Sequence, residues 1–433
     1  MPMERRREDE GAAAPVAGGS GIGVLPDSVL AHVLGFLPAE EAVRTCVLAR
    51  RWRHLWKSAT GLRVVAADGE FLGTEEKLQD FVGRVLLLRE GAPLDTCVLG
   101  LGIKWHNSDS LRCVSTWFWH AVTCSVRFLR LQHNILGPFR HLEDKTLVSQ
   151  HLTRLELSSI GSGSNFLDFS SCPVLEHLVL SFCNLSRSAK KISSTSLKYL
   201  SMTYNNLVHD YRIHIYAPNL ISLRLDSCSG KTPILESMPS LVDAYVQLDE
   251  DSADQCKLWH PHYEGEDCGC ESCQNSNNLG DDSNRCVLLK GLSEATNLML
   301  ISEPTTFIFR MDLRWCPTFS KLKTLLLNDY WCVPDDFHAL SCILEHSPVL
   351  EKLTLLFAEE LEPEVELEGS INPTERSAAI SEHLKKVEVK CEVVGERILK
   401  VIWFLRMFNI PVSGKSKSEL QPHCTNTHVA GSF

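Results

Sequence analysis

The sequence predicts an α/β protein in which a small all-α helical module is followed by a solenoid of short parallel strands, with helices or loops outside them. Two observations support this. Near the N-terminus, three short stretches carry apolar residues at helical spacing, and further along, segments of the form Leu-x-x-Leu-x-Leu recur at near-constant intervals. With 433 residues, of which 44% are hydrophobic, the chain can bury one long core.

The stretch from Leu25 to Trp56 predicts the three helices of the module. The first begins at Pro26 and Asp27, because aspartate is a favoured N-cap and proline is tolerated just before a helix. Gly35 weakens its end and Pro38 terminates it. One face of this helix is predicted to carry an apolar stripe made of Val29, Leu30, Val33, Leu34 and Leu37.

A second helix is predicted from Ala39, because Glu40 and Glu41 then lie in its first turn, where the helix dipole favours negative charge. Its inward side is predicted to carry Val43, Cys46 and Val47. A third helix is predicted to have one apolar face, made of Leu48, Trp52, Leu55 and Trp56. About 35 residues bury too little surface to be stable alone, so the module must dock on another surface.

This stretch resembles an F-box, and in particular the plant form of that motif. The resemblance rests on the opening Leu25-Pro26, on Leu30 and Leu34, on Phe36-Leu37-Pro38, on Val43 and on the run from Arg44 to Trp56. In that family the F-box binds a Skp-type adaptor, which joins it to the cullin and RING subunits of a ubiquitin ligase. The resemblance implies adaptor contact for Leu25, Pro26, Leu30, Leu34, Leu37, Val47 and Trp52. The sequence leaves open which of these instead hold the three helices together.

The solenoid is predicted from the repeated leucine pattern. Its middle position falls at Leu129, Leu155, Leu178, Leu200, Leu223 and Ala244, which gives steps of 26, 23, 22, 23 and 21 residues. These steps match the period of about 20 to 29 residues of a leucine-rich repeat. Further copies are predicted at 322–327, 350–355 and 384–389, with a degenerate one at 297–300. Cys183, Asn205 and Cys228 share one position after their strands, where the repeat family places Asn or Cys to satisfy backbone groups at the turn.

In each predicted strand the leucines point into the core, so the residues between them line the concave face. These outward residues mix charged, hydroxyl and aromatic side chains, which suits protein recognition and does not indicate an active site. As candidates for contact with a target protein we single out Glu156, His177, Val179, Tyr199, Arg224 and Tyr245. The alternative is that most of these side chains are simply solvated.

Two helices are predicted between the module and the first repeats. Thr60 to Gly91 is interpreted as a linker followed by one helix, and Asp109 to Val126 as a second helix. In the second, the cluster Trp117-Phe118-Trp119 is predicted to pack on a neighbouring layer rather than to form a ligand cage. The segment from Glu382 to Ile410 resembles the C-terminal FBD-type region of plant F-box proteins with leucine-rich repeats, and predicts a strand followed by an amphipathic helix.

The predicted domains are a disordered lead at 1–22, an F-box at 23–60, a leucine-rich-repeat domain at 61–410 and a disordered tail at 411–433. Within the repeat domain, insertions are predicted at 249–284 and 359–376, and the FBD-like part spans 381–410. No stretch approaches the roughly 18 apolar residues of a membrane span, and the N-terminus lacks the apolar core of a signal peptide. We therefore expect an intracellular protein, in the nucleus or the cytoplasm, whose cysteines are free and mostly buried.

The first insertion holds a cluster with metal-ligand residue types. Cys270 and Cys273 have the pair spacing that zinc uses, and Cys268, His260 and His262 could complete four ligands. Because a second well-spaced pair is missing, we predict no metal and no cofactor, with zinc at these residues as the open alternative. The sequence has no P-loop, no G-x-S-x-G elbow and no dinucleotide fingerprint. A net charge of −11 argues against binding to nucleic acid or to an anionic membrane.

These observations favour a non-catalytic substrate-recognition subunit of an SCF-type (Skp, cullin, F-box) ubiquitin ligase. The F-box would dock the adaptor, and the repeats would select a protein for ubiquitination. The alternative is a scaffold that binds proteins through its repeats without promoting ubiquitination. An enzyme is the third and weakest interpretation. The sequence identifies neither the target protein nor a small molecule on the concave face.

Overall fold

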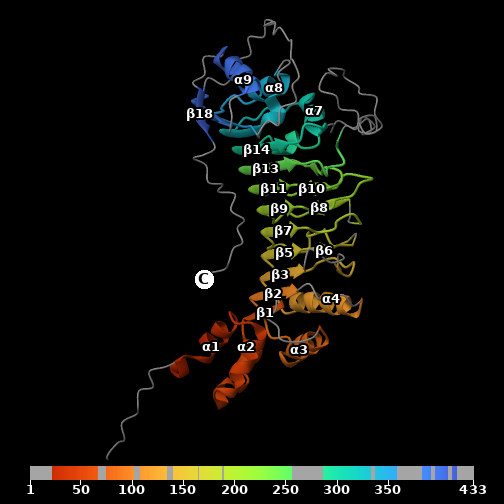
Figure 1. Ribbon diagram of the computed structural model, residues 1–433. Helices are drawn as coiled ribbons and strands as arrows, with labels where there is room; N and C mark the ends of the chain where they lie inside the picture. Colours follow the sequence, from red (N-terminus) through yellow and green to blue (C-terminus); the bar gives the residue numbers. More distant parts are fainter. Residues whose placement is uncertain are drawn as a thin grey trace, which may run out of the picture.

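The computed structural model describes residues 22–66, 75–101, 108–133, 140–163, 165–187, 190–255, 286–332, 337–357, 383–391, 395–407 and 412–416. One continuous sheet runs through these residues, and its strands all pair in parallel and stack one above the next (Figure 1). The helical module lies at one end and the C-terminal helix at the other, both displaced toward the same side. The sheet face on that side is called the concave face below, and helices and short strands cover the opposite, convex face.

The strands of the long sheet follow chain order. They are β1 (Gly61–Ala66), β2 (Thr96–Leu101), β3 (Phe128–His133), β5 (Arg154–Ser158), β7 (His177–Ser181), β9 (Tyr199–Thr203), β11 (Ser222–Asp226), β13 (Asp243–Leu248), β14 (Asn297–Ser302), β15 (Thr324–Asn328), β16 (Lys352–Leu356), β17 (Lys386–Cys391) and β18 (Val412–Ser416). Two small parallel sheets lie beside it, formed by β4 (Arg140–His141) with β6 (Ile160–Gly161), and by β8 (Lys191–Ser193), β10 (His214–Tyr216) and β12 (Ile234–Leu235).

The helices fall into three groups. The module contains η1 (Ile22–Val24), α1 (Asp27–Leu34), α2 (Ala39–Arg44), η2 (Thr45–Val47), η3 (Arg50–Arg53) and η4 (Leu55–Ser58), where η denotes a 3₁₀ helix. Next come α3 (Glu75–Leu88) and α4 (Ser108–Thr123). The C-terminal half adds α6 (Leu289–Leu292), α7 (Ile308–Leu313), η5 (Asp329–Cys332), α8 (His338–Glu345) and α9 (Glu396–Met407). No described helix has the length and apolar character needed to cross a membrane.

The repeated leucines form one continuous core. The strand register places Leu129 beside Leu155, Leu155 beside Leu178, and Leu178 beside Leu200, and all four side chains are buried. Alternation along each strand then turns the intervening residues to the concave face. The predicted repeats are confirmed, including the degenerate copy, which forms β14. The C-terminal strand and helix are confirmed as β17 and α9.

Side chains close the turns that follow the strands. The Oδ1 atom of Asn205 accepts the backbone N–H of Cys183 at 2.8 Å, and its Nδ2 donates to the carbonyl of Leu180 at 2.9 Å. The thiol of Cys228 donates to the carbonyl of Met202 at 3.6 Å. Each bond joins one repeat to the next, so the predicted role of this turn position is confirmed. Every cysteine in the described ranges is a free thiol, and most are buried, as expected.

The aromatic cluster of α4 packs into the convex layer, as predicted. Trp117 and Phe118 are buried, and the ring of Phe118 lies 5.9 Å from that of Phe166 in the following repeat region. Trp119 contacts the same ring edge-on at 6.4 Å. The cluster is therefore part of the core.

A buried ion pair fixes the chain where the first insertion was predicted to begin. The guanidinium of Arg212 donates to both carboxylate oxygens of Asp254, at 2.8 and 2.6 Å, and the two side chains are only 6% and 2% exposed. Asp254 also accepts the backbone N–H of Thr232 at 2.8 Å. The start of the predicted insertion is therefore packed into the fold at Asp254. Residues 256–284, with the candidate zinc ligands, lie outside the described residues, and so does the second predicted insertion.

The module contacts the first strand of the sheet through two glycines. A Cβ atom on Gly61 would lie 2.2 Å from the carbonyl oxygen of Gly35, so only glycine allows this approach. Nearby, the buried Arg89 at the end of α3 donates to the carbonyls of Trp56 at 3.2 Å and Ala59 at 2.7 Å. The module therefore shares a core with the sheet, as its small size requires.

Several predictions for the module are wrong. Asp27 is the first residue of α1 and pairs with Arg51 at 2.6 Å, while Pro26 occupies the N-cap position. The third predicted α-helix is a pair of 3₁₀ helices, η3 and η4. The predicted apolar stripes are buried only in part. Leu30, Leu34, Leu55 and Trp56 are buried, whereas Val29, Val33, Val47 and Leu48 are exposed. In the third stretch, short 3₁₀ helices turn different residues inward than an α-helix would.

Strands also occur where none was predicted. The supposed linker after Thr60 begins with β1, and β2 lies before α4. Both lack the complete leucine pattern, but β1 pairs in register with β2, and β2 pairs in register with β3. At the other end, Val412–Ser416 forms β18 beside β17, so the prediction of a disordered tail is wrong for these residues. Residues 1–21 and 417–433 lie outside the described part of the chain.

Candidate functional site

The first candidate site is an apolar surface on the module. Of the eighteen large apolar side chains that the described residues expose, eight lie between Ile22 and Leu48. They are Ile22, Val24, Leu25, Val29, Val33, Phe36, Val47 and Leu48, called the module surface below. Val47 is the most open, with 82% of its surface exposed. Exposed apolar groups at this density are typical of a surface that binds a partner.

The seven residues predicted to contact an adaptor fall into two groups. Leu25, Pro26 and Val47 are exposed, and Leu37 and Trp52 are half-buried. Leu30 and Leu34 are 0% and 1% exposed and pack into the core of the module, so they have no surface left for a partner. The prediction is corrected for these two residues, whose spacing on α1 places them on its inner face.

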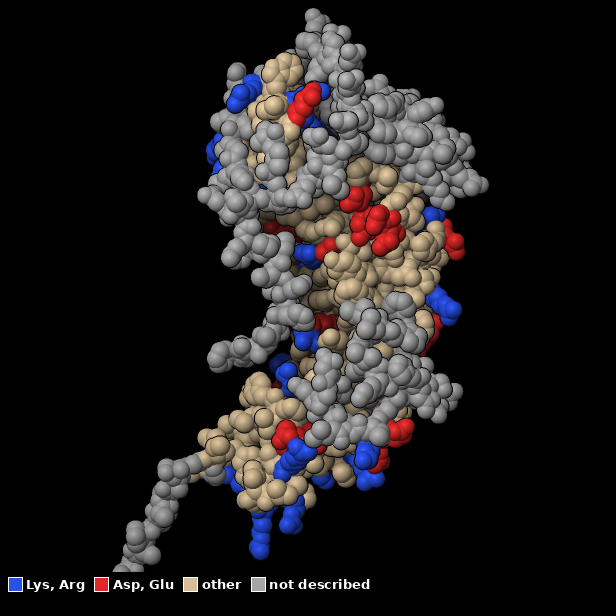
Figure 2. Space-filling view, viewed as in Figure 1, with Lys and Arg blue, Asp and Glu red and all other residues tan. Residues whose placement is uncertain are grey.

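The outer end of the module is basic. Figure 2 shows lysine and arginine side chains projecting from the lower end of the molecule, and Arg50, Arg51 and Arg53 are exposed in the module. Some of this charge is already paired, since Arg44 contacts Glu40 at 2.5 Å and Arg51 contacts Asp27. Such exposed pairs add little stability, so the remaining positive charge is free to complement an acidic partner.

The second candidate site is the concave face. The strand register brings the six predicted residues together on this face, with Glu156 beside Val179 and Arg224 beside Tyr245. The rings of His177 and Tyr199 stack at 4.3 Å and nearly in parallel. Partial burial and the neighbouring positive charge of Arg154 lower the pKa of His177, which favours the neutral imidazole in this stack.

Not all of these side chains are available to a partner. Glu156 is only 9% exposed and accepts bonds from Arg130 and Arg154, both at 2.5 Å. The role predicted for Glu156 in target binding is therefore corrected to positioning of the two arginines. Their guanidinium groups lie over the ring of Phe128, at 5.5 and 5.6 Å.

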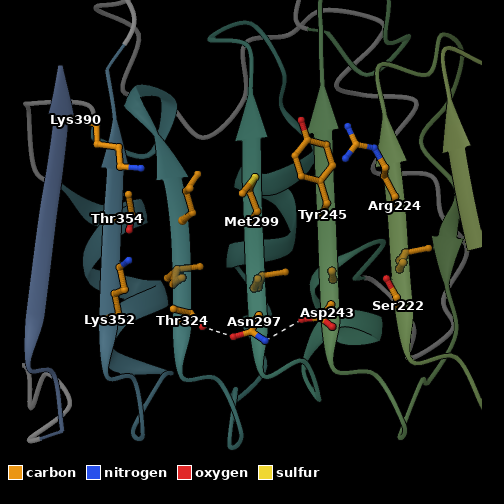
Figure 3. Close-up of a pocket in the computed structure, with 15 residues that line it drawn as sticks. Ser222, Arg224, Asp243, Tyr245, Asn297, Met299, Thr324, Lys352, Thr354 and Lys390 are labelled. Atoms are coloured by element: carbon orange, nitrogen blue, oxygen red, sulfur yellow. Dashed lines mark hydrogen bonds between the residues drawn. The ribbon is translucent and has the colours of Figure 1, made fainter. Parts of the chain in front are cut away.

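A shallow groove of about 420 Å³ crosses the concave face from β11 to β17 (Figure 3). Arg224 and Tyr245 line one end, and Met299 lies in the middle. Lys352 and Lys390 line the other end. Arg224 lies 4.2 Å from the ring of Tyr245, which holds its charge near the groove. The groove has Met299 at its centre and a cationic side chain at each end, of which Arg224 is paired with Asp226 and Lys352 with Glu388.

Of the residues that line this groove, only Arg224 and Tyr245 were predicted to contact a target protein. Met299, Thr324, Lys352, Thr354 and Lys390 were missed, although the strands that carry them were predicted. The signal was present, because these residues alternate with buried leucines in the same way as Arg224 and Tyr245 do.

Beside the groove, Glu388 on β17 is held by two lysines. Its carboxylate contacts Lys386 at 2.5 Å and Lys352 at 3.1 Å. The hydrogen bond from Lys386, with a smaller contribution from Lys352, lowers the pKa of Glu388 from 4.5 to about 2. A carboxylate with a lowered pKa stabilises the fold above its unfolded-state pKa, and this contribution is lost as the pH falls toward the folded-state value.

We therefore expect Glu388→Gln to flatten the acid side of the stability profile. Wild type should lose its advantage in melting temperature over the variant as the pH falls from about 5 to about 2, because protonation breaks the same contacts that the glutamine lacks. Melting followed by circular dichroism across this range measures the difference. Glu143→Gln, at an exposed contact with Lys145, is the control and should give a constant small difference. A pH-independent difference for Glu388→Gln would contradict the prediction.

The fold and the two surfaces define a class: a modular protein-binding protein, with one apolar surface on a helical module and a second surface on a parallel-strand solenoid. A family model for the F-box domain matches residues 22–61. The chain also aligns with four F-box proteins of Arabidopsis thaliana. It is 30% identical over 267 residues to an F-box/LRR-repeat protein, covering 52% of this chain and 67% of that protein.

A second F-box/LRR-repeat protein is 27% identical over 403 residues, covering 82% of this chain and 95% of that protein. An F-box/FBD/LRR-repeat protein is 26% identical over 388 residues, covering 81% of this chain and 80% of that protein. For another F-box/LRR-repeat protein, the alignment covers 54% of that protein's length. This chain belongs to the F-box/LRR-repeat family. In general, an F-box domain implies a Skp-type adaptor as partner, and F-box/LRR-repeat proteins act as adaptors in substrate recognition.

Proposed function

We propose that this protein is a substrate-recognition subunit of an SCF-type ubiquitin ligase and acts inside the cell. Its module surface binds a Skp-type adaptor, and through it the cullin and RING subunits. Its concave face binds a target protein and holds a target lysine near the charged ubiquitin-conjugating enzyme. The chain itself supplies position and orientation, while other subunits supply the chemistry.

The observation that carries this proposal is the exposure of the module surface. An F-box that served only its own chain would bury its apolar residues, yet Val29, Val33 and Val47 face solvent while the neighbouring Leu30 and Leu34 complete the core. Desolvation of these exposed side chains supplies binding energy, and the arginines at the outer end of the module favour an acidic adaptor.

We expect Val47→Asp to weaken adaptor binding at least about 30-fold, because a charge would then be buried in the contact at a cost of about 2 kcal/mol or more. Val47 is open enough for the substitution to leave the fold intact. Co-purification and titration with a plant Skp adaptor measure the effect. The matched control is Val148→Asp, which places the same charge at a valine that is 58% exposed in the repeats. Equal affinity of the two variants would contradict the proposed contact.

Ubiquitination separates this function from that of a scaffold. A reconstituted ligase with wild-type protein should modify a bound target, and Val47→Asp should abolish modification while the target still binds. A scaffold would bind the target and leave it unmodified with either protein. In the concave groove, Arg224→Ala combined with Lys352→Ala should reduce target binding without changing adaptor affinity, because the groove and the module surface are separate.

A further inference from the structure

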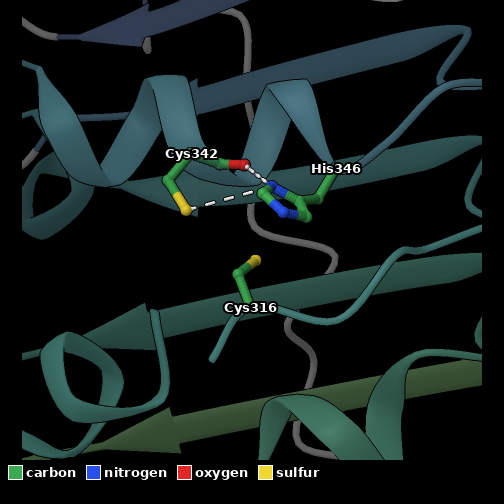
Figure 4. A group of neighbouring side chains, drawn as sticks. All are labelled: Cys316, Cys342 and His346. Carbon is green, nitrogen blue, oxygen red and sulfur yellow. Dashed lines mark hydrogen bonds between the residues drawn. The ribbon is translucent and has the colours of Figure 1, made fainter. Parts of the chain in front are cut away.

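Two thiols and an imidazole meet where α8 packs against the loop that precedes β15. Cys342 lies on α8, His346 follows the last residue of that helix, and Cys316 lies on the loop after α7. Their ligand atoms all lie within 4.8 Å of one another. Figure 4 shows the two sulfur atoms and the ring turned toward one space. Among the histidine, cysteine and acidic residues that the structure describes, these three form a group close enough to share one metal ion.

Backbone contacts hold the two segments together without any ion. The carbonyl of His346 accepts the N–H of Phe319 at 2.8 Å, which joins the end of α8 to the loop that carries Cys316. The carbonyl of Leu313 accepts the N–H of Cys316 at 3.3 Å and lies 3.8 Å from the sulfur of Cys342. The three ligands are therefore positioned by the fold.

The imidazole is oriented for binding through its second nitrogen. The Nδ1 atom of His346 lies 2.8 Å from the carbonyl oxygen of Cys342. A carbonyl only accepts, so Nδ1 carries the proton and Nε2 keeps its lone pair. Metal-binding histidines are typically oriented in this way, with the other nitrogen donating to a carbonyl or carboxylate.

We propose that Cys316, Cys342 and His346 bind one zinc ion, with a water molecule or another donor in the fourth position. Two sulfur ligands and one imidazole suit zinc. Tetrahedral zinc places such ligand atoms about 3.5 to 3.8 Å apart, and the ligand atoms of the three residues already lie within 4.8 Å of one another. The ion joins α8 to the loop of the preceding repeat. The site is distinct from the cluster around Cys270.

This site could not be predicted from the sequence, because Cys316 lies one repeat before the other two residues. The available signal was Cys342 and His346 at a spacing of four, which places both on one side of a helix. No sequence pattern connects them to Cys316.

The test uses the full chain with Cys268→Ser, Cys270→Ser and Cys273→Ser, so that the other cluster contributes no thiol ligand. The protein is kept reduced with a phosphine, stripped with a chelator, loaded with zinc sulfate and desalted, and its zinc content is measured by mass spectrometry. One zinc per chain is expected. Cys342→Ser and His346→Asn should each reduce this at least tenfold, whereas Cys113→Ser, at a half-buried thiol on α4, should retain it.

His346→Asn separates coordination from packing. The asparagine amide can still donate to the Cys342 carbonyl but has no atom in the place of Nε2. We expect this variant to keep the melting temperature of the metal-free parent and to lose the rise in melting temperature that zinc gives the parent. Absence of zinc from the parent overturns the proposal, and so does zinc that persists in both Cys342→Ser and His346→Asn. A Cys316–Cys342 disulfide in the reduced, zinc-loaded parent would also overturn it.

Discussion

Replacing Asp254 by alanine is expected to lower the free energy of unfolding by about 3 to 5 kcal/mol, because it leaves a buried guanidinium without its partner. The carboxylate accepts both bonds from Arg212 and one from the backbone of Thr232. With both charged side chains almost fully buried, water cannot replace these bonds. Urea unfolding, followed by circular dichroism, measures the loss.

The control for this prediction removes both charges together. Arg212→Met combined with Asp254→Leu replaces the pair by apolar side chains, and we expect it to be close to neutral or mildly stabilising. If Asp254→Ala costs no more than the double variant, the ion pair is not satisfied in the way that the structure indicates. Amide exchange around Thr232 locates the effect, because the alanine variant should expose this N–H first.

Replacing Gly61 by alanine is expected to detach the module from the sheet. The added Cβ would lie 2.2 Å from the oxygen and 2.8 Å from the carbonyl carbon of Gly35. These are backbone atoms, so no change of side-chain rotamer relieves the overlap. Forced overlaps in a packed core cost about 1 to 3 kcal/mol, and more where the backbone has to move.

Hydrogen exchange distinguishes local detachment from general unfolding. In Gly61→Ala we expect faster exchange in α1, α2 and β1, with β9 and β11 unchanged. Gly83→Ala is the matched control, because no heavy atom lies within 4 Å of its added Cβ on the exposed side of α3. That variant should be slightly stabilised, since alanine favours the helix over glycine. Identical exchange in the two variants would show that the module does not depend on this contact.

The repeats could be predicted from sequence because each one places a long aliphatic side chain at the same interval. Leu155, Leu178 and Leu200 meet in space as their spacing predicts. The first two strands were missed because Val64 in β1 and Cys97 in β2 occupy core positions that hold leucine in β3. Gly61 has a tertiary reason, since it contacts the module, and that contact is not encoded by local spacing.

The sites were predictable only in part, for a related reason. Alternation indicates which residues face the concave side, but neighbours from other repeats decide whether they are available. Glu156 is neutralised by Arg130 from the preceding repeat as well as by Arg154. In the module, spacing predicted one apolar stripe on α1 without indicating which of its residues are buried. Packing against η4 buries Leu30 and leaves Val33 exposed.

The close approach of Gly35 and Gly61 fixes the distance between the module surface and the concave groove, and so between the two proposed partners. Neighbouring strands are about 4.8 Å apart, so β11, six strands from β1, lies about 29 Å along the sheet, and β16 about 48 Å along it. The module contacts β1 directly, so these two distances apply from the module as well. Gain or loss of one repeat would shift the bound target by about 5 Å relative to the ligase, with both binding surfaces unchanged. In the proposed complex, the number of repeats would therefore decide which lysines of a target come within reach of the ligase.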